Sequence, residues 1–394
     1  PTMVAMAAPT NVAAQRLLDI TGMCAGTYHR VAYERPVVDP HSGALLCFVP
    51  RADGAADIHA GSLLIMDEAS MADERITAAV LAALPRSVRV LAIGDPCQLP
   101  PVKGRPGFAL EQPGYLLTQI HRQAGGSPLL DAITVVRERR LPLVPASIRL
   151  IGGTVIDVTA EALGRALAIG ATAPNRAGGL AVLLVSSNAA RGQVNAAARA
   201  AMGFPHAAAG PQKGERVIAF STNHNLHVSN SEVGTVTFCK EGHEVAGQAT
   251  WWVGIDIDGR GVVKVAVPQE SWFPHEAHWW DPELVVAPVA RARAGGQPKD
   301  TFALLALQPA YAVTVYKAQG LEYEGGAILV EGYKRYPPKD AWKLHYTAIS
   351  RFRSWVQFVR LAPDRVVPSL GLMPSGLAEI VPKVVTTPVK GTPR

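Results

Sequence analysis

The sequence predicts an α/β protein with two parallel-sheet domains and an inserted block of antiparallel β-structure. Short apolar runs alternate with alanine-rich amphipathic stretches through the first 145 residues, which is typical of parallel strands covered by helices. The same alternation returns after position 160 and again near position 326. Between about residues 213 and 302 it gives way to short strands separated by glycine turns.

The first α/β domain is expected to cover residues 1–145. Its strands are predicted at MVAMAA, LLIMDE and VRVLAIGD, and its helices at NVAAQRLLDI, ADERITAAVLAAL and PLLDAITVVRERR. An insertion at about residues 32–61 contains VVDPHSGALLCFV, whose strand, turn and strand pattern predicts a β-hairpin.

The second α/β domain is expected in two pieces, residues 146–212 and 303–374. Its helices are predicted at AEALGRALAIG and RGQVNAAARAAM, and its strands at GLAVLLVSSN, GAILVEG and WVQFVRL. The insertion at residues 213–302 shows no convincing helix and predicts a small antiparallel barrel with strands at ERVIAF, EVGTVTF, TWWVGIDIDGRGVVKVAV and ELVVAPV. Residues 375–394 are rich in Pro, Thr and Lys and predict a loose tail.

The composition limits the possible partners and settings. A net charge of +6 and a pI near 9.2 favour a polyanionic partner over an acidic one. The four cysteines form no C-x-x-C pair, so neither a disulfide framework nor a zinc ribbon is indicated, and a reducing, cytoplasmic setting is expected. No apolar run reaches about 18 residues, so no membrane span is predicted. The start PTMVAMAAPT lacks the charged region of a signal peptide and is interpreted as a chain that begins within a strand.

Two adjacent acids, Asp67 and Glu68, follow the buried strand LLIM. A parallel strand delivers such residues to its carboxyl end, where α/β sheets bind ligands. In nucleoside triphosphatases one acid at this position holds Mg²⁺ and a second orients or deprotonates the attacking water. Taken alone, the pair fits a structural role equally well.

Three further side chains strengthen the nucleotide interpretation. Gln98, in VLAIGDPCQLPPV, emerges beside Asp67 if the two strands are neighbours, and it could sense the γ-phosphate or the water. LLTQIHRQ supplies Arg122, and LHYTAISRFR supplies Arg351 from the other α/β domain. Guanidinium groups on two sides of one cleft stabilise charge on a transferring phosphoryl group.

Seven segments resemble motifs Ia, Ib, II, III, IV, V and VI of superfamily 1 helicases, in that order: AAPTNVAAQRL, ITGMCAGTYHR, LIMDEASM, GDPCQLPPV, LTQIHRQ, AYAVTVYKAQGLEYE and YTAISR. The forms of motifs II, III and V resemble the 5′-to-3′ branch typified by RecD and the phage helicase Dda. GERVIAFSTNHNLHVSNSEVGTV resembles the segment that opens an SH3-like barrel, called 2B, in that branch.

The resemblance implies two RecA-like domains, 1A and 2A, with ATP and Mg²⁺ between them. In this scheme Asp67 holds Mg²⁺, Glu68 is the base, and Arg351 is the arginine finger. Gln98 and Arg122 would read the γ-phosphate. Gly320 and Glu322 would couple the nucleotide to domain motion.

Single-stranded DNA is implied across the tops of both α/β domains. The candidate contacts are Pro9, Thr10, Thr27, His29, Asn188, Thr314, Tyr316 and Lys317. Tyr316 stands where the family usually has His, and it could stack on a base or pack internally. The hairpin insertion would be the 1B pin that splits a duplex, or an ordinary excursion that protects the domain edge. The tryptophans of the barrel region are expected in packing and interdomain contacts.

One motif of the family is not found, because the 394 residues contain no G-x-x-x-x-G-K-[ST] phosphate loop. Truncation before the first residue is the favoured explanation, and loss of the loop or its supply by a separate polypeptide are the alternatives.

The leading hypothesis is an ATP-dependent DNA helicase that moves 5′ to 3′ on single-stranded DNA and acts at junctions with duplex. It could be part of a larger conjugative relaxase or recombination subunit. The alternatives are an ATPase-inactive nucleic-acid-binding module, with protein partners in replication, recombination or a CRISPR-type complex, and an RNA helicase. The Ala-, Gly- and Pro-rich composition suggests a bacterial or phage source.

Overall fold

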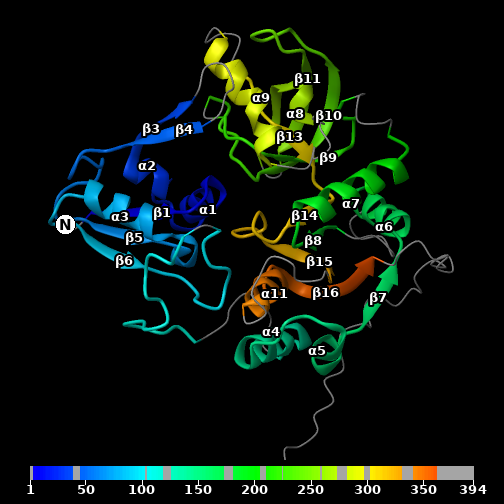
Figure 1. The fold of residues 1–394 in the computed structure, drawn as a ribbon, viewed down its shortest axis with the longest axis horizontal. Coiled ribbons are helices and arrows are strands. Elements are labelled where there is room, and N and C mark those ends of the chain that lie inside the picture. The colour runs from blue at the N-terminus through cyan, green and yellow to red at the C-terminus, as the bar shows by residue number, and fades with distance from the viewer. Residues whose placement is uncertain are drawn as a thin grey trace, which may run out of the picture.

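The computed structural model describes residues 3–38, 45–102, 104–118, 126–172, 181–204, 210–223, 225–257, 260–272, 282–296, 302–330 and 340–361. Two parallel sheets, of four and five strands, and one five-stranded antiparallel sheet organise these residues. Figure 1 shows the first parallel sheet with its helices on one side, the second parallel sheet on the other, and the antiparallel sheet above the second. The predicted α/β fold with two parallel sheets is confirmed.

The first parallel sheet has the strand order β2-β1-β5-β6. These strands are β1 (Val4–Ala8), β2 (Ala25–Thr27), β5 (Leu63–Met66) and β6 (Arg89–Ala92). The helices beside them are α1 (Asn11–Thr21), α2 (Tyr28–Ala32), the short 3₁₀ helix η1 (Ala69–Met71) and α3 (Glu74–Ala83). The side-chain oxygens of Thr10, Thr27 and Asp73 accept N–H bonds from the first turns of α1, α2 and α3, so short polar residues determine where each helix begins.

The second parallel sheet has the order β14-β8-β15-β16-β7. Its strands are β7 (Val155–Val158), β8 (Leu183–Val185), β14 (Ala312–Thr314), β15 (Tyr323–Leu329) and β16 (Phe352–Leu361). Its helices are α4 (Pro128–Arg139), α5 (Pro145–Leu150), α6 (Ala160–Thr172), α7 (Asn188–Ala201) and α11 (Ala341–Ile349). Nearly every residue of α11 is buried, which matches its apolar sequence.

The antiparallel sheet has the order β12-β11-β10-β9-β13. Its strands are β9 (Arg216–Ala219), β10 (Val233–Glu241), β11 (Thr250–Ile257), β12 (Gly261–Pro268) and β13 (Leu307–Pro309). One face carries a cluster of buried aliphatic residues with the fully buried Trp272. Strand β13 belongs to this sheet although it lies beyond residue 302, where the insertion was expected to end.

The prediction that residues 213–302 contain no helix is wrong. Two helices, α8 (Gln269–Trp272) and α9 (Pro282–Gly295), occur there, and α9 includes the ELVVAPV segment predicted as a strand. Val285, Val289 and Ala292 are all buried. Their spacing of four and three residues is the period of a helix, so one helix face packs inward.

A two-stranded antiparallel pair, β3 (Tyr33–Val38) and β4 (Leu45–Pro50), occupies the first insertion. The residues that join these strands lie outside the described part of the chain, as do Trp279 and Trp280. No helix in the described ranges is long and apolar enough to cross a membrane.

The largest hydrophobic cluster crosses the boundaries between the sheets. It joins Leu99 after β6, Leu129 on α4, Leu184 on β8, Ile218 on β9 and Val289 on α9. The second α/β part and the antiparallel insertion therefore share one core, which the loop after β6 joins through Leu99. The first sheet has clusters of its own, one of which contains Leu64, Met66 and Val80.

Candidate nucleotide and nucleic-acid site

Asp67 and Glu68 lie at the carboxyl end of β5, as predicted. The Asp67 backbone N–H donates to the carbonyl of Ala7 on the neighbouring strand at 2.9 Å. The Tyr28 hydroxyl donates to the Asp67 carbonyl. Glu68 adopts the left-handed conformation, with φ of 52°. This backbone is uncommon outside glycine and is enriched at functional sites, so the acids sit on a turn whose shape is imposed by its surroundings.

The environment of these acids suits a cation. Burial raises the pKa of Asp67, while a hydrogen bond from the Glu68 backbone and the charge of Arg16 oppose that rise. A half-buried carboxylate gains from a Mg²⁺ ion, which usually takes one or two carboxylates together with substrate phosphates. No cluster of three or more metal-binding side chains occurs within the described ranges, so phosphate oxygens and water would complete the coordination.

Gln98 lies in the turn after β6, and its Oε1 is buried without a hydrogen-bond partner in the described structure. Its backbone N–H donates to the Asp95 carbonyl at 3.0 Å. An orphaned buried acceptor costs about 1 to 3 kcal/mol, and a donor such as a bound water would recover that loss. Gln98 therefore fits the role of positioning a water molecule.

The turn that contains Gln98 is hydrogen-bonded to α11, a helix that belongs to the second parallel sheet. The Leu99 N–H donates to Thr347 Oγ1 at 3.0 Å. Asp95 accepts from the Tyr346 hydroxyl at 2.6 Å and from Arg137 at 3.4 Å. The bonds to Thr347 and Tyr346 connect segments 248 and 251 residues apart in sequence, so they tie the turn to α11.

Arg351 follows α11 directly and is 0% exposed. Its Nε donates to the Thr347 carbonyl at 3.2 Å, and its Nη2 donates to Ser350 Oγ at 3.1 Å. Thr347 thus contacts both the residue after Gln98 and the predicted arginine finger. Arg122 lies outside the described residues, so its predicted place is untested.

Gly320 and Glu322 lie against α1 of the first sheet. Gly320 has φ of 82°, and a Cβ built there would lie 3.5 Å from the Cβ of Ala13. Glu322 forms ion pairs with Arg16 on α1 and with Arg353 on β16. Arg16 was not singled out from the sequence, although it lies within the AAPTNVAAQRL segment. Its role becomes visible only when α1 is packed against the loop that contains Gly320 and Glu322.

The predicted nucleic-acid residues form two groups, each at the carboxyl end of a parallel sheet. In the first sheet, Ala8 pairs with Thr27, which places Pro9 and Thr10 beside Thr27. His29 is exposed near the rings of Tyr33 and Phe48.

In the second sheet, Thr314 pairs with Val185, close to the start of α7 at Asn188. The hydroxyl of Thr314 is mostly engaged locally, because it accepts from the Lys317 N–H at 3.4 Å. Tyr316 is partly buried against the core, which favours internal packing over base stacking.

A loop of the antiparallel part connects the two groups. Asn11 donates to Thr222 Oγ1 at 3.0 Å, and the same hydroxyl accepts from the Asn230 N–H at 3.2 Å. Lys317 Nζ donates to Asn230 Oδ1 at 2.7 Å. The start of α1, the 222–231 loop and Lys317 therefore form one continuous polar rim.

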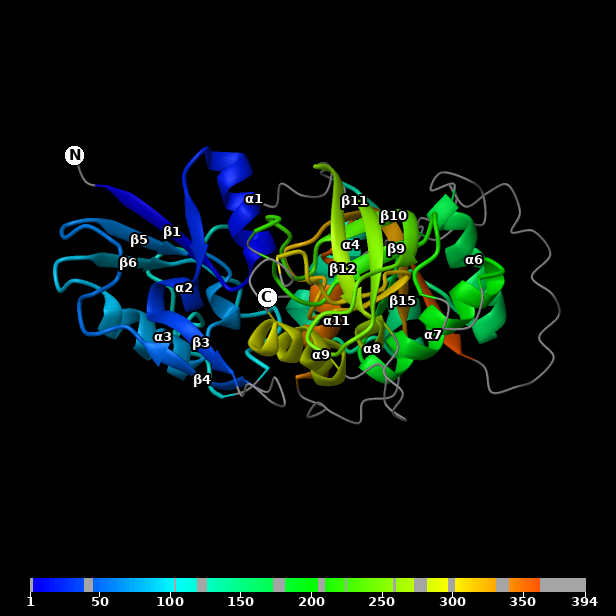
Figure 2. The same ribbon diagram turned by 90° about the horizontal axis from the view of Figure 1, so that it is seen from above.

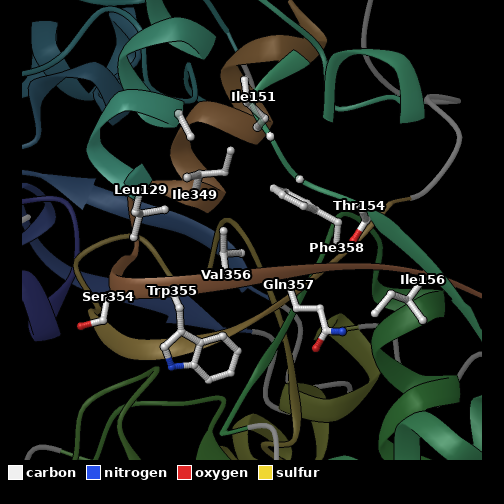
Figure 3. Close-up of a pocket in the computed structure, with 13 residues that line it drawn as sticks. Leu129, Ile151, Thr154, Ile156, Ile349, Ser354, Trp355, Val356, Gln357 and Phe358 are labelled. Atoms are coloured by element: carbon white, nitrogen blue, oxygen red, sulfur yellow. The ribbon is translucent and has the colours of Figure 1, made fainter. Parts of the chain in front are cut away.

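The described structure contains a small apolar cavity and a larger open one. A small apolar cavity of about 50 Å³ lies between α4, α11 and β16. In Figure 3, Leu129 and Ile349 lie on the same side of β16 as Val356 and Phe358, while Trp355 points to the other side. None of the predicted site residues lines it. A larger, open cavity of about 900 Å³ is lined by α1, the Gly320–Tyr323 segment and strands of the antiparallel sheet.

Comparison with known proteins agrees with this arrangement. A family model described as an AAA domain matches residues 2–142. The chain is 28% identical over 366 residues to an ATP-dependent RecD2 DNA helicase of Deinococcus radiodurans. The resemblance to superfamily 1 helicases of the RecD/Dda-like type is confirmed. The match covers 89% of this chain but only 42% of the RecD2 helicase.

Solved structures of Pif1 helicases share the fold of this chain. The structure of Bacteroides Pif1 bound to single-stranded DNA has a TM-score of 0.51 and 16% identity, over 96% of this chain and 86% of that one. Pif1 helicase from Candida albicans has a TM-score of 0.50 and 16% identity, over 91% and 84%. A third structure concerns DNA unwinding at forked duplex by two Pif1 helicases, with a TM-score of 0.51 and 17% identity over 91% and 82%. At these identities the likeness supports the RecA-like parallel-sheet fold alone.

Proposed function

We propose that this chain forms the motor core of an ATP-dependent DNA helicase that moves 5′ to 3′ along single-stranded DNA and unwinds duplex. The observation that carries the proposal is the contact of Thr347 with both the Gln98 turn and Arg351. This contact joins the first parallel sheet, which bears Asp67 and Glu68, to helix α11, which precedes Arg351. Similarity to RecD2, an ATP-dependent DNA helicase, supports the activity. The direction rests on the resemblance of motifs II, III and V to the 5′-to-3′ branch.

In this proposal residues 1–145 form domain 1A, and residues 32–61 within it form the 1B pin. Domain 2A consists of residues 146–212 and 303–374. Residues 375–394, where a loose tail was expected, lie outside the described residues. Residues 213–302 form the SH3-like barrel 2B, together with the neighbouring strand β13. The antiparallel order β12-β11-β10-β9-β13 supports a separate β-domain at this position.

Each residue of the nucleotide site has a distinct task. Asp67 would hold Mg²⁺, which would supply positive charge to neutralise the charge that develops on the phosphoryl group. Glu68 would accept the proton of the attacking water, and Gln98 Oε1 would orient that water. Arg351 and Arg122 would stabilise the charge on the transferring phosphoryl group. Because Arg351 is fully buried against Thr347 and Ser350, its approach to a phosphate requires movement of α11 relative to β5.

The phosphate cradle is proposed at the outer edge of β6. No other described strand pairs with that edge. An unpaired strand edge is a template for a further strand. A strand followed by a glycine-rich loop, placed here, would present its amides beside Asp67 and Gln98. The given sequence contains no such loop, so the segment would be supplied by residues outside it.

Single-stranded DNA is proposed to follow the polar rim from Pro9, Thr10, Thr27 and His29 to Asn188, Thr314 and Lys317. Backbone amides at the capped starts of α1, α2 and α7 are suited to phosphate groups. The Pif1 structures with single-stranded and forked DNA support this class of partner.

The test is DNA-stimulated ATP hydrolysis by the protein as its natural reading frame encodes it. Glu68→Gln is expected to reduce the stimulated rate by about a hundredfold or more, because a general base contributes about 10² to 10⁴. Glu74→Gln, an exposed change six residues further on, is the matched control and should behave as wild type. Equal rates for the two variants would contradict the role of Glu68.

The alternative is a nucleic-acid-binding module that does not hydrolyse ATP, which the missing loop favours. It predicts binding of single-stranded DNA that ATP and Mg²⁺ do not change, and no turnover in the complete protein. Protein partners in replication, recombination or a CRISPR-type complex would then provide its context. A preference for RNA of equal sequence would instead indicate an RNA-directed member of the fold.

A further inference from the structure

Helix α1 touches all three sheets at different points along its length. Its apolar side, Ala13 and Ala14, packs against its own sheet at Ala8. Asn11, in the first turn, donates to Thr222 of the antiparallel part. Arg16, more than one turn later, reaches the second parallel sheet. Figures 1 and 2 both place α1 on the side of the first sheet that faces the rest of the molecule.

Arg16 makes two different contacts with one loop. Its Nη1 donates to the Gly320 carbonyl at 3.3 Å, and its Nη2 forms an ion pair with Glu322. The side chain of Glu322 is 9% exposed, so this carboxylate depends on its guanidinium partners. A planar guanidinium can bridge two acceptors in this way, whereas an ammonium group acts as a single point charge.

The open cavity of about 900 Å³ lies between α1 and the other two sheets. Val12, Gln15 and Asp19 of α1 face it, opposite Glu232 and Arg260 of the antiparallel part. In the described structure, Asn11 and Arg16 make hydrogen bonds and an ion pair that connect α1 to the antiparallel part and to the Gly320–Glu322 loop. Such contacts can be exchanged without opening a hydrophobic interface.

Glu322 already has a second partner for such an exchange. Arg353, on β16, donates to the same carboxylate through Nε at 3.0 Å and Nη2 at 2.5 Å. If α1 moves away, Arg353 retains Glu322 while the Gly320 carbonyl loses Arg16. This second contact would allow an arrangement in which Arg353 keeps its bonds to Glu322 after Arg16 has left.

We propose that Arg16 is a positioning residue that couples single-stranded nucleic acid at the start of α1 to the conformation of the Gly320–Glu322 loop. A strand bound at Thr10 and Asn11 would fix the helix, and the rigid helix would carry that constraint about 7 Å to Arg16. The loop would then be held in the arrangement with both arginines. The inference rests on the proposed function, because it requires that nucleic acid binds at this end of α1.

Hydrogen exchange tests the coupling without requiring catalysis. The Leu321 N–H donates to the Ala318 carbonyl at 3.0 Å, and the Tyr323 N–H donates to the Arg351 carbonyl at 2.9 Å. These two amides report whether the loop opens. Exchange is measured in the complete protein, with and without a single-stranded oligodeoxynucleotide of about 12 nucleotides, a length within the usual range of binding sites for single strands.

In the wild-type protein DNA is expected to slow exchange at both amides about fivefold or more, the lower end of typical coupling between sites. Arg16→Ala should bind DNA within about twofold of wild type but lose this slowing. Arg16→Lys should restore part of it, because the charge remains and the bridge is lost. Arg165→Ala removes the Arg165–Glu161 pair within α6 and is the matched control, expected to behave as wild type.

Two outcomes overturn the idea in distinguishable ways. If the wild-type protein binds no single-stranded DNA, the proposed function fails and the inference fails with it. If DNA binds and slows exchange equally in wild type and Arg16→Ala, the coupling role of Arg16 is refuted while the proposed function stands.

Discussion

Acid is expected to destabilise the protein through His345, in the middle of the buried helix α11. The side chain is 3% exposed. Its Nδ1 accepts the Leu143 N–H at 2.8 Å, which requires that nitrogen to be unprotonated. Burial lowers the pKa of His345 from 6.5 to about 3. The folded protein therefore holds this imidazole neutral where an unfolded chain would charge it.

The size of the effect follows from the two pKa values. Between pH 6.5 and about 3 the unfolded chain binds a proton at this position and the folded protein does not. Stability therefore rises with pH in this window, and it is lost as the pH falls below 6.5. Each pH unit well inside the window costs about 1.4 kcal/mol. Lowering the pH from about 7 to 5 should cost about 2 kcal/mol through this group alone.

The assay is the free energy of unfolding in urea at pH 7 and pH 5 for the wild type and for His345→Gln. The variant is expected to lose about 2 kcal/mol less between the two pH values, because glutamine does not titrate. His59→Gln, at an exposed position, should retain the wild-type pH dependence. If His345→Gln and the wild type lose the same free energy, the reasoning about the buried imidazole is refuted.

Three further changes test the core and the site. Arg199→Met is expected to lower the free energy of unfolding, measured by thermal unfolding, by about 3 to 5 kcal/mol, because the 0% exposed Glu215 carboxylate loses its guanidinium partner. Glu215→Gln in that background should recover part of the loss. Thr347→Val removes the acceptor of the Leu99 N–H and should lower DNA-stimulated hydrolysis while leaving DNA affinity unchanged; a parallel loss of affinity would point to misfolding. Burial and the charge of Arg191 lower the pKa of Lys317 to about 7, so its ammonium is fully charged only at lower pH. At about pH 6, Lys317→Gln should weaken single-strand binding and make the slope of log affinity against log salt shallower by about 0.7, and an unchanged slope would remove Lys317 from the phosphate contacts.

Local sequence patterns predicted the parallel sheets and the place of the acids. The run LLIM followed by Asp67 and Glu68 needs only the direction of one buried strand to bring both acids to a sheet edge. The helix α9 was missed because apolar residues around Pro288 resemble a short strand when they are read alone. The buried spacing of Val285 and Val289 is informative only once α9 is packed against the core.

The contacts between distant segments could not be predicted in the same way. Arg16 and Glu322 lie 306 positions apart, and nothing near either residue in the sequence specifies the other. Their pairing depends on how two sheets dock across a cavity. Predictions from motifs therefore identified residues that act within one sheet more reliably than residues that join two.

The continuous hydrophobic cluster has a consequence for how the β-insertion can be handled. Ile218 and Val289 of that insertion share buried contacts with Leu184 and Leu99 of the α/β parts. Removing the insertion from the chain, or transferring it to another protein, would expose apolar surface on the insertion and on the remaining α/β parts. Limited proteolysis should accordingly release no stable insertion fragment, and heating should melt the second parallel sheet and the antiparallel sheet in a single transition. These two sheets are expected to unfold as one cooperative unit.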